Sequence, residues 1–181
     1  MSEMLELIDF FLRAIELKST TRKGWVRVGV KEPESVAEHS YFLALLAMVL
    51  GKRFKLNCEK LVKMALLHDL GEIETGDITP YDDKVEEKRL QERCFAEALL
   101  VLLGDVEFIE LGMEYQNVAS EEALFLKQLD KLEMAFQALE YENVYSNLNF
   151  ESFWDTARAE IKIPQLAELL KAIEARRQLR R

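Results

Sequence analysis

The sequence predicts an all-α protein that forms one compact domain of about six to eight helices. The chain has 181 residues, of which only seven are Gly and three are Pro, and so few breakers favour long helices with short connections over a sheet of many strands. Apolar residues recur at helical spacing along most of the chain, and no segment is a convincing strand. A chain of this length can bury a sizeable core. We therefore expect one domain over residues 1–181, without a repeat or a linker.

The N-terminal part is predicted as a helix followed by a loop. Over residues 3–18, apolar side chains return at the spacing of one helix face. Residues 19–33 break this pattern with two Gly and one Pro, so they indicate an extended loop. The loop carries Trp25 between Arg22 and Arg27. The local sequence favours this Trp as a lid over the core, and the alternative, given the two Arg, is a wall of a substrate pocket.

A capping box marks the start of the second helix. Ser35 and Glu38 have the spacing at which each side chain binds the backbone amide of the other. His39 then falls in or just beyond the first turn, where the positive end of the helix dipole disfavours a protonated imidazole. A neutral imidazole is the form that binds metal ions. Gly51, followed by two basic residues, suits the end of this helix.

The third helix is predicted over residues 58–70, with Gly71 as its C-terminal breaker. His68 and Asp69 are neighbours near its end, and neighbours on a helix point about 100° apart. Both reach one ion only if it lies between their two directions, which a looser turn near the Gly would ease. Glu72 falls four residues after His68, and so on the same side if the helical turn persists.

The remaining chain is predicted as a polar turn followed mainly by helices. The segments are a polar turn at 76–83, a long helix at 84–103, a short piece with acids at both ends at 105–115, and helices at 121–147, 149–161 and 164–181. Ser120 is a fair N-cap for the helix that carries Asp130. Pro164 suits the first position of the last helix.

The composition excludes several classes of partner. The net charge of −9 argues against broad nucleic-acid binding, which needs a basic surface to displace counterions. The longest apolar run has about nine residues from Phe42, and a membrane span needs about twenty. Cys58 and Cys94 have no short spacing, so free thiols in a reducing compartment are favoured over a disulfide. The N-terminal residues do not resemble a signal peptide, and we expect a soluble, cytoplasmic protein.

Histidine and carboxylate side chains indicate a metal site. The chain has only two His, His39 and His68, and each stands beside a carboxylate in a polar break of an apolar helix. Asp130 interrupts the apolar face of another helix, where an unpaired carboxylate is costly to bury. One divalent ion between these helices would account for all three observations. On spacing alone two alternatives stay open: structural histidines, and an ion pair of Asp130 with Lys127 or Lys131.

Three motifs resemble the HD-domain metal phosphohydrolases: SVAEHS, then LLHDLGEIETGDITP about thirty residues on, then LDKLEMAFQALEY. The order His, His-Asp, Asp is the signature of that superfamily. GWVRVGVKEPESVAEHS, the GDITP that follows HDLGE, and the FW-D-T pattern near the C-terminus narrow the resemblance to the HD-domain 5′-deoxynucleotidases. The similarity covers nearly the whole chain. It implies one HD domain, with a metal-binding core at about 35–140 and C-terminal helices at 149–181 packed onto it.

The resemblance also implies the chemistry of the site. One divalent ion (Mn²⁺, Co²⁺, Fe²⁺ or Zn²⁺) would be bound by His39, His68, Asp69 and Asp130, with open positions for a water and a phosphate oxygen. The ion would lower the pKa of that water and withdraw charge from the phosphorus. Glu72 would orient the water and take its proton as general base. With no third His, the chain would hold one metal ion rather than two.

Substrate contacts follow from the same resemblance. The groups that would contact the substrate are Arg22, Trp25, Asp77, Thr79 and Pro80. The Arg would clamp the phosphate, a role for which Arg27 is the alternative, and the Trp would pack on the sugar and disfavour a ribose 2′-hydroxyl. The Asp would accept from the 3′-hydroxyl, and the Thr and Pro would help to shape the sugar side. In the bacterial branch an Arg directly precedes the Trp, whereas here Gly24 does, as in the eukaryote-like branch.

The function implied is a phosphomonoesterase that hydrolyses deoxynucleoside 5′-monophosphates. The alternatives are a cyclic-nucleotide phosphodiesterase or nucleoside triphosphate hydrolase with the same site, and a non-catalytic nucleotide-binding regulatory domain. The helices at 84–103 and 165–181 carry more apolar residues than one side of a small bundle needs. This excess suggests a symmetric homodimer, and the alternative is that the two helices only close the core.

Overall fold

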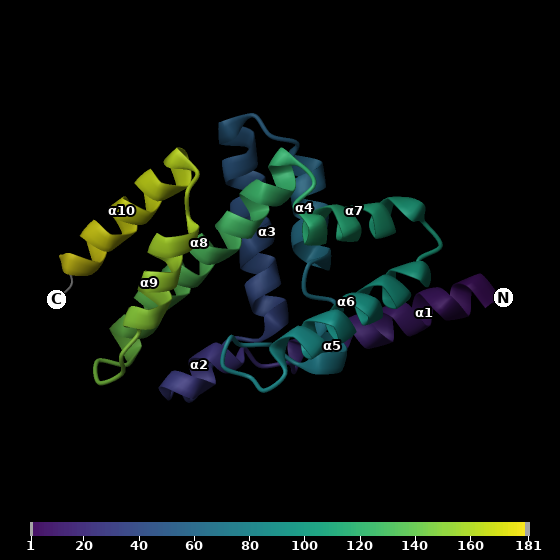
Figure 1. Ribbon diagram of the computed structural model, residues 1–181, viewed down its shortest axis with the longest axis horizontal. Helices are drawn as coiled ribbons and strands as arrows, with labels where there is room; N and C mark the ends of the chain where they lie inside the picture. The colour runs from purple at the N-terminus through teal and green to yellow at the C-terminus, as the bar shows by residue number, and fades with distance from the viewer. Residues whose placement is uncertain (1, 180–181) are drawn as a thin grey trace.

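The computed structural model describes residues 2–179 and is all-α, as predicted (Figure 1). Its helices are α1 (Ser2–Ala14), the 3-10 helix η1 (Ile15–Lys18), α2 (Lys23–Val28), α3 (Val36–Phe54), α4 (Cys58–Leu67), α5 (Glu72–Thr75), α6 (Val85–Val101), α7 (Val106–Asn117), α8 (Glu121–Val144), α9 (Glu151–Glu160) and α10 (Pro164–Gln178). In this range the only β feature is an isolated bridge between Thr21 and Ser35. None of these helices combines the length and the apolar character that a membrane span requires. The short helices α2 and α5 take the number above the predicted six to eight.

Two segments are more helical than their sequence indicates. Residues 19–33, expected as an extended loop, contain α2, whose six residues are too few to show a helical period. Gly29 ends this helix with a φ of 99°, a left-handed conformation that Gly adopts without strain. The short piece expected at 105–115 is the regular helix α7, for which Asp105 is the N-cap.

α3 begins at the predicted residue and ends later than predicted. Ser35 Oγ accepts from the Glu38 amide at 3.2 Å, and Glu38 Oε2 accepts from the Ser35 amide at 2.7 Å, so the capping box is confirmed. The helix continues through Gly51 to Phe54. At Gly51 it lies against α4, because a Cβ there would stand 2.7 Å from Leu61 Cδ1. This Gly therefore serves close helix packing and does not break the helix.

Three helices form the centre of the fold and carry the candidate metal ligands. α8 packs against both α3 and α4, and α3 and α4 pack closely on each other (Figure 1). α9 and α10 lie against α8 on the side away from α7. Fully buried side chains fill the interior, among them Leu43, Leu61, Leu126, Leu129, Leu132 and Trp154. A close-packed interior fixes the backbone of these helices, so side chains that project from them into one space hold their relative positions.

Gly71 lies where the turn after α4 meets α6, and its substitution tests that contact. A Cβ at Gly71 would stand 2.3 Å from the backbone oxygen of Glu92, and backbone atoms cannot move aside as a side chain can. Gly71→Ala is therefore expected to destabilise the fold by about 1–3 kcal/mol, the cost of overpacking. Urea unfolding measures this change. The control is Gly112→Ala, whose Cβ would meet only the tip of the Leu100 side chain at 3.0 Å. An unchanged unfolding midpoint for Gly71→Ala would contradict the tight contact.

Candidate metal centre

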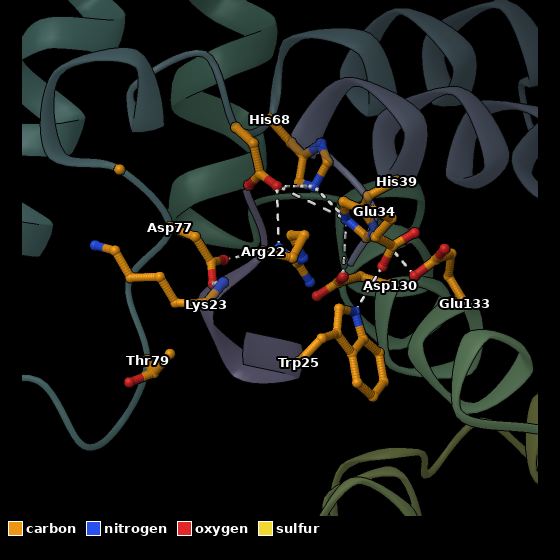
Figure 2. A network of polar contacts seen from close by, with 12 residues as sticks. Arg22, Lys23, Trp25, Glu34, His39, His68, Asp77, Thr79, Asp130 and Glu133 are labelled. Carbon is orange, nitrogen blue, oxygen red and sulfur yellow. Dashed lines mark hydrogen bonds and ion pairs between the residues drawn. The ribbon is translucent and has the colours of Figure 1, made fainter. Parts of the chain in front are cut away.

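Side chains from three separate helices converge on one point in the interior (Figure 2). His39 projects from the first turns of α3, His68 and Asp69 follow the end of α4, and Asp130 lies in the middle of α8. His39 Nε2 is 3.3 Å from His68 Nε2 and 3.3 Å from Asp130 Oδ1. Asp69 Oδ2 is 3.0 Å from His68 Nε2 and 3.7 Å from His39 Nε2. The structure thus brings the four predicted ligands together.

The turn after α4 explains how neighbouring residues face the same point. α4 ends at Leu67 rather than at the predicted residue 70. The amide of Leu70 then binds the carbonyl of Leu67 at 3.3 Å, and the amide of Glu72 binds that of Asp69 at 3.0 Å. These bonds span three residues and so form a tighter turn than the α-helix. The helix predicted to reach residue 70 is therefore too long, and the tighter turn supplies the change in geometry near Gly71 that would let both side chains reach one ion.

The donor set fits one divalent transition-metal ion. It offers two imidazole nitrogens and two carboxylates, the ligand types that such ions share. One ligand atom from each of His39, His68 and Asp130 lies within 4.8 Å of the others. Asp69 Oδ2 is buried and has no hydrogen-bond partner, which is costly for an ionised oxygen unless a cation binds it. These groups could therefore bind such an ion.

Hydrogen bonds behind the two imidazoles aim their Nε2 lone pairs at the site. His39 Nδ1 lies 2.8 Å from Glu133 Oε2, and His68 Nδ1 lies 2.8 Å from the Ala65 carbonyl oxygen. A carbonyl oxygen and an ionised carboxylate only accept hydrogen bonds, so Nδ1 carries the proton in both rings. Metal-binding histidines are held in this way in many proteins.

The contacts predicted by the two alternatives, an ion pair of Asp130 and a structural role for His39, are present and are compatible with a metal site. Lys131 Nζ binds Asp130 Oδ2 at 2.8 Å, as the ion-pair alternative predicts. The other oxygen of that carboxylate faces His39. His39 is fully buried and hydrogen-bonded to Glu133, as a structural histidine would be. Each group therefore uses one atom for structural support and leaves one atom free for an ion.

Glu133 is a functional candidate that sequence reasoning missed. Its side chain is 1% exposed, and its Oε1 has no hydrogen-bond partner. The available signal was its place three residues after Asp130, a spacing that puts two side chains on one face of a helix. A carboxylate on that apolar face needs a buried donor. The sequence does not say that this donor is His39, which is 94 residues away.

Removal of Glu133 is expected to weaken metal binding without loss of any ligand. Glu133→Ala should bind the ion about 10- to 100-fold more weakly, because His39 loses the acceptor that fixes its tautomer and orientation. Glu133→Gln keeps an acceptor and should lie between this variant and the wild type. Calorimetric titration with Mn²⁺ or Zn²⁺ measures the affinities, with Glu140→Ala, an exposed change on the same helix, as the control. Equal affinities for Glu133→Ala and the control would contradict the role.

Buried carboxylates give the site an excess of negative charge. Burial, together with Glu133, raises the pKa of Glu34 to about 7. Burial and Arg22 lower the pKa of His39, but Glu133 and Asp130 raise it more, to about 10. A proton on His39 Nε2 would occupy the position of a bound cation, so this raised pKa reflects the same demand for positive charge.

Glu72, the predicted base, begins the short helix α5 at the edge of the site. Its side chain is 6% exposed, and Oε2 has no hydrogen-bond partner. Burial, and then Asp69, raise the pKa of Glu72 well above its ordinary value. Since a negative neighbour contributes to this shift, a cation bound at Asp69 would bring the pKa down and favour the ionised form.

Arg22 lies beside the ligands, whereas Arg27 does not. Arg22 Nη1 is 3.2 Å from Asp77 Oδ1 and 3.6 Å from Asp69 Oδ2 (Figure 2). The other Asp77 oxygen accepts from the Lys23 amide at 2.6 Å. Arg27 instead stacks on the Tyr81 ring at 3.9 Å and is exposed. Of the two candidates for the phosphate clamp, the geometry therefore favours Arg22.

Trp25 belongs mainly to the core, as the lid interpretation predicts. It is 2% exposed and stacks on Phe153 with ring centroids 4.0 Å apart. Its Nε1 donates to Glu34 Oε1 at 2.8 Å (Figure 2). The ring also borders the cavity at the metal site, so an edge remains available to a ligand.

A cavity of about 1040 Å³ opens over the ligands. Its lining includes the predicted residues Arg22, Trp25, His68, Asp69, Glu72, Asp77, Thr79, Pro80 and Asp130. His39 does not line the cavity and is fully buried. Thr79 does not point freely into it, because its hydroxyl and its amide both donate to Asp82 Oδ2 at 2.7 Å. The cavity is large enough to enclose a nucleotide.

Comparisons with known proteins agree on one family. The family described as HD domain matches residues 14–169. The 5′-deoxynucleotidase HDDC2 of Homo sapiens is 39% identical over 173 residues, which cover 92% of this chain and 84% of that protein. The 5′-deoxynucleotidase HDDC2 of Dictyostelium discoideum is 36% identical over 189 residues, covering 96% of this chain and 100% of that protein.

Solved structures share the arrangement of helices. A protein from Pyrococcus horikoshii superposes with a TM-score of 0.77 at 34% identity, over 92% of this chain and 97% of that chain. The HD phosphohydrolase DatZ of cyanophage S-2L, bound to dA and one catalytic Zn²⁺ ion, superposes with a TM-score of 0.59 over 92% and 95%. At 19% identity, this second likeness concerns the fold alone.

Proposed function

The chain belongs to the HD domain family, and from that premise we propose that it is a metal-dependent 5′-deoxynucleotidase, which hydrolyses deoxynucleoside 5′-monophosphates to the deoxynucleoside and phosphate. Relatives named 5′-deoxynucleotidase are 39% and 36% identical over most of the chain. The observation that carries the proposal is the convergence of His39, His68, Asp69 and Asp130, of which all but the buried His39 line the cavity together with Glu72.

The mechanism assigns the proton transfer to Glu72. A divalent ion held by the two His and the two Asp would lower the pKa of a water and withdraw charge from the phosphate. Glu72 takes a proton from the attacking water as its oxygen bonds to phosphorus. As the bond from phosphorus to the 5′-oxygen breaks, the same carboxyl can return that proton to the leaving oxygen. Its burial keeps bulk water from competing for the proton.

The substrate contacts remain part of the proposal. Arg22 lies next to Asp69 and offers positive charge to the phosphate, while Asp77 holds its guanidinium. Asp77 would also accept from the 3′-hydroxyl, since each carboxylate oxygen accepts more than one hydrogen bond. The edge of Trp25 that borders the cavity would face the sugar. Thr79 and Pro80 would shape the sugar side through the loop that Asp82 holds.

The test is phosphate release from a panel of nucleotides. We expect the metal-loaded protein to release phosphate from deoxynucleoside monophosphates faster than from ribonucleoside monophosphates, and His68→Ala to abolish the release. Cyclic nucleotides and deoxynucleoside triphosphates belong in the same panel, because a phosphodiesterase or triphosphohydrolase would act on them instead. Tight nucleotide binding without turnover would instead indicate a non-catalytic regulatory domain.

We also propose the identity of the metal and the state of the protein. The ion is Mn²⁺, Co²⁺, Fe²⁺ or Zn²⁺, and metal analysis of protein purified without added metal would identify it.

The chain is a homodimer in the cytoplasm. On α6, Leu90 and Val101 are 63% and 59% exposed, as a dimer surface requires, whereas Leu166, Leu170 and Ile173 of α10 are buried in the core. Light scattering that gives the mass of one chain, or cell fractionation that finds the protein in membranes, would contradict these proposals.

The chain is proposed to work as one HD domain. Its metal-binding core would span about 35–140, with the helices of 149–181 packed onto it. Contacts of α9 and α10 with α8 support this division. Two parts of the chain outside this core reach the cavity: the segment of Arg22 and Trp25, and Phe153 and Thr156 of α9. A fragment limited to 35–140 that folded and kept full activity would contradict the need for the rest.

A further inference from the structure

Lys127 lines the cavity close to the metal ligands and has no role in the mechanism above. It lies on α8, one turn before Asp130. Its Nζ stands 4.0 Å from the centre of the Tyr115 ring. That ring packs against the ring of His68, with centroids 5.5 Å apart. Lys127 is thus connected to two candidate ligands, through its own helix and through one aromatic ring.

Most other cations of this cavity already bind a partner. The polar partners are Asp77 for Arg22 at 3.2 Å, Glu86 for Arg89 at 3.4 Å, Gln116 for Arg93 at 3.0 Å, and Asp130 for Lys131 at 2.8 Å. Among residues 2–179, no carboxylate lies within ion-pair distance of Lys127, and its contact is the Tyr115 ring. Arg27 also contacts a ring, but it is exposed and lies over the loop at Tyr81. Lys127 is therefore the half-buried cavity cation whose hydrogen bonds are free for a ligand.

The position of Lys127 is costly unless an anion binds there. Burial lowers the pKa of the Lys127 ammonium even though Asp130 and Asp69 act in the opposite sense. Its three N–H donors point at no acceptor among the described side chains, whereas an aromatic ring offsets only part of the lost hydration. An oxyanion in the cavity would complete these hydrogen bonds. A lysine ammonium binds phosphate as a compact charge.

We propose that Lys127 binds the phosphate of the substrate, its ammonium donating to a non-bridging phosphate oxygen. This inference rests on the proposed function, which requires a phosphate beside the ligands. Two residues on different elements would then bind the negative charge of the phosphate. Arg22 already forms an ion pair with Asp77, whereas the Lys127 ammonium contacts the Tyr115 ring and forms no ion pair with a described residue. Lys127 also offers its charge to the phosphate oxygens as negative charge moves onto them during hydrolysis.

The test measures phosphate binding separately from turnover. Lys127→Met keeps a side chain of similar length against Tyr115 and removes the charge. We expect its Kd for inorganic phosphate, measured by calorimetry on metal-loaded protein, to rise about 10- to 100-fold, the loss typical of one charged hydrogen bond. The KM for a deoxynucleoside monophosphate should rise with it, and the Kd for the metal should stay within about twofold. Lys127→Arg should recover part of the phosphate affinity.

Further variants separate this role from its competitors. Lys171→Met removes an exposed Lys on α10 and controls for net charge. Arg27→Met tests the other ring-bound cation, and a larger loss of phosphate affinity there than in Lys127→Met overturns the assignment. If Lys127→Met binds phosphate as the wild type does, or loses the metal as well, the proposal is also overturned. Thermal unfolding verifies the fold, and Lys127→Arg provides the comparison if the Met variant does not fold.

The outcomes distinguish this inference from the proposed function. Hydrolysis by the wild type, with equal phosphate affinity in wild type and Lys127→Met, would leave the function standing and overturn the inference. No hydrolysis of any deoxynucleoside monophosphate, with phosphate binding that weakens in Lys127→Met, would overturn the function and support an anion site at Lys127.

Discussion

Asp69→Asn is expected to give a folded protein that binds its metal ion more than about 100-fold more weakly and has lost nearly all hydrolase activity. Loss of a group that only supports a ligand costs about 10- to 100-fold, and in the proposed site Asp69 would itself be a ligand. Its Oδ2 lies 3.0 Å from His68 Nε2 and is buried without a hydrogen-bond partner. Asn has the same shape but lacks the negative charge, so the ion loses one of its two anionic ligands.

The fold should survive this substitution, which makes the result interpretable. Arg22 loses the ion pair with Asp69 at 3.6 Å but keeps the ion pair with Asp77 at 3.2 Å. Calorimetric metal titration, phosphate release and thermal unfolding of the metal-free protein measure the three quantities. Asp9→Asn, an exposed change on α1, is the matched control. An Asp69→Asn protein with the metal affinity of the wild type would contradict the ligand set.

Glu72→Gln is expected to keep the metal ion and to lower kcat by about 10²- to 10⁴-fold, the usual contribution of a general base. The amide fills the same space and cannot take a proton from water. Because Glu72 is buried at the start of α5, nothing else on that helix replaces it: Glu74, two residues on, is exposed. Glu74→Gln is therefore the matched control and should retain the activity of the wild type.

Two results would change the assignment of Glu72. If Glu72→Gln also loses the ion, measured by calorimetry, Glu72 is a ligand rather than a base. If kcat is unchanged, the proton passes to another group. Steady-state kinetics separates these cases from a binding defect, because loss of a base lowers kcat whereas loss of a substrate contact raises KM.

Local sequence signals predicted the parts of the fold that depend on nearby residues. The capping box of Ser35 and Glu38 is such a case, because both partners lie within one helical turn. The end of α3 could not be predicted in this way, because the lack of a side chain at Gly51 makes room for Leu61, which lies on another helix. α2 was missed because six residues do not complete two turns.

The candidate site divides in the same way. His68 and Asp69 are adjacent, and residue type together with family resemblance predicted them as ligands. The bond from His39 to Glu133 and the pairing of Arg22 with Asp77 join residues 94 and 55 positions apart. Such contacts depend on how the helices pack, which periodicity does not specify. The environment of Lys127 could not be predicted from the sequence for the same reason, since it depends on Tyr115 of α7.

The metal centre also joins parts of the chain that folding must bring together. His39 and His68 are 29 residues apart, and α8 contributes Asp130 from much further along. An unfolded chain keeps these groups apart, so only the native chain presents the full proposed ligand set, and an ion bound there would act as a reversible cross-link between α3, α4 and α8. Preferential binding to the native chain adds about 2.7 kcal/mol of stability when free metal is 100 times Kd. A cell short of this metal would therefore be expected to hold less of the folded protein, in addition to losing the activity of the molecules without metal.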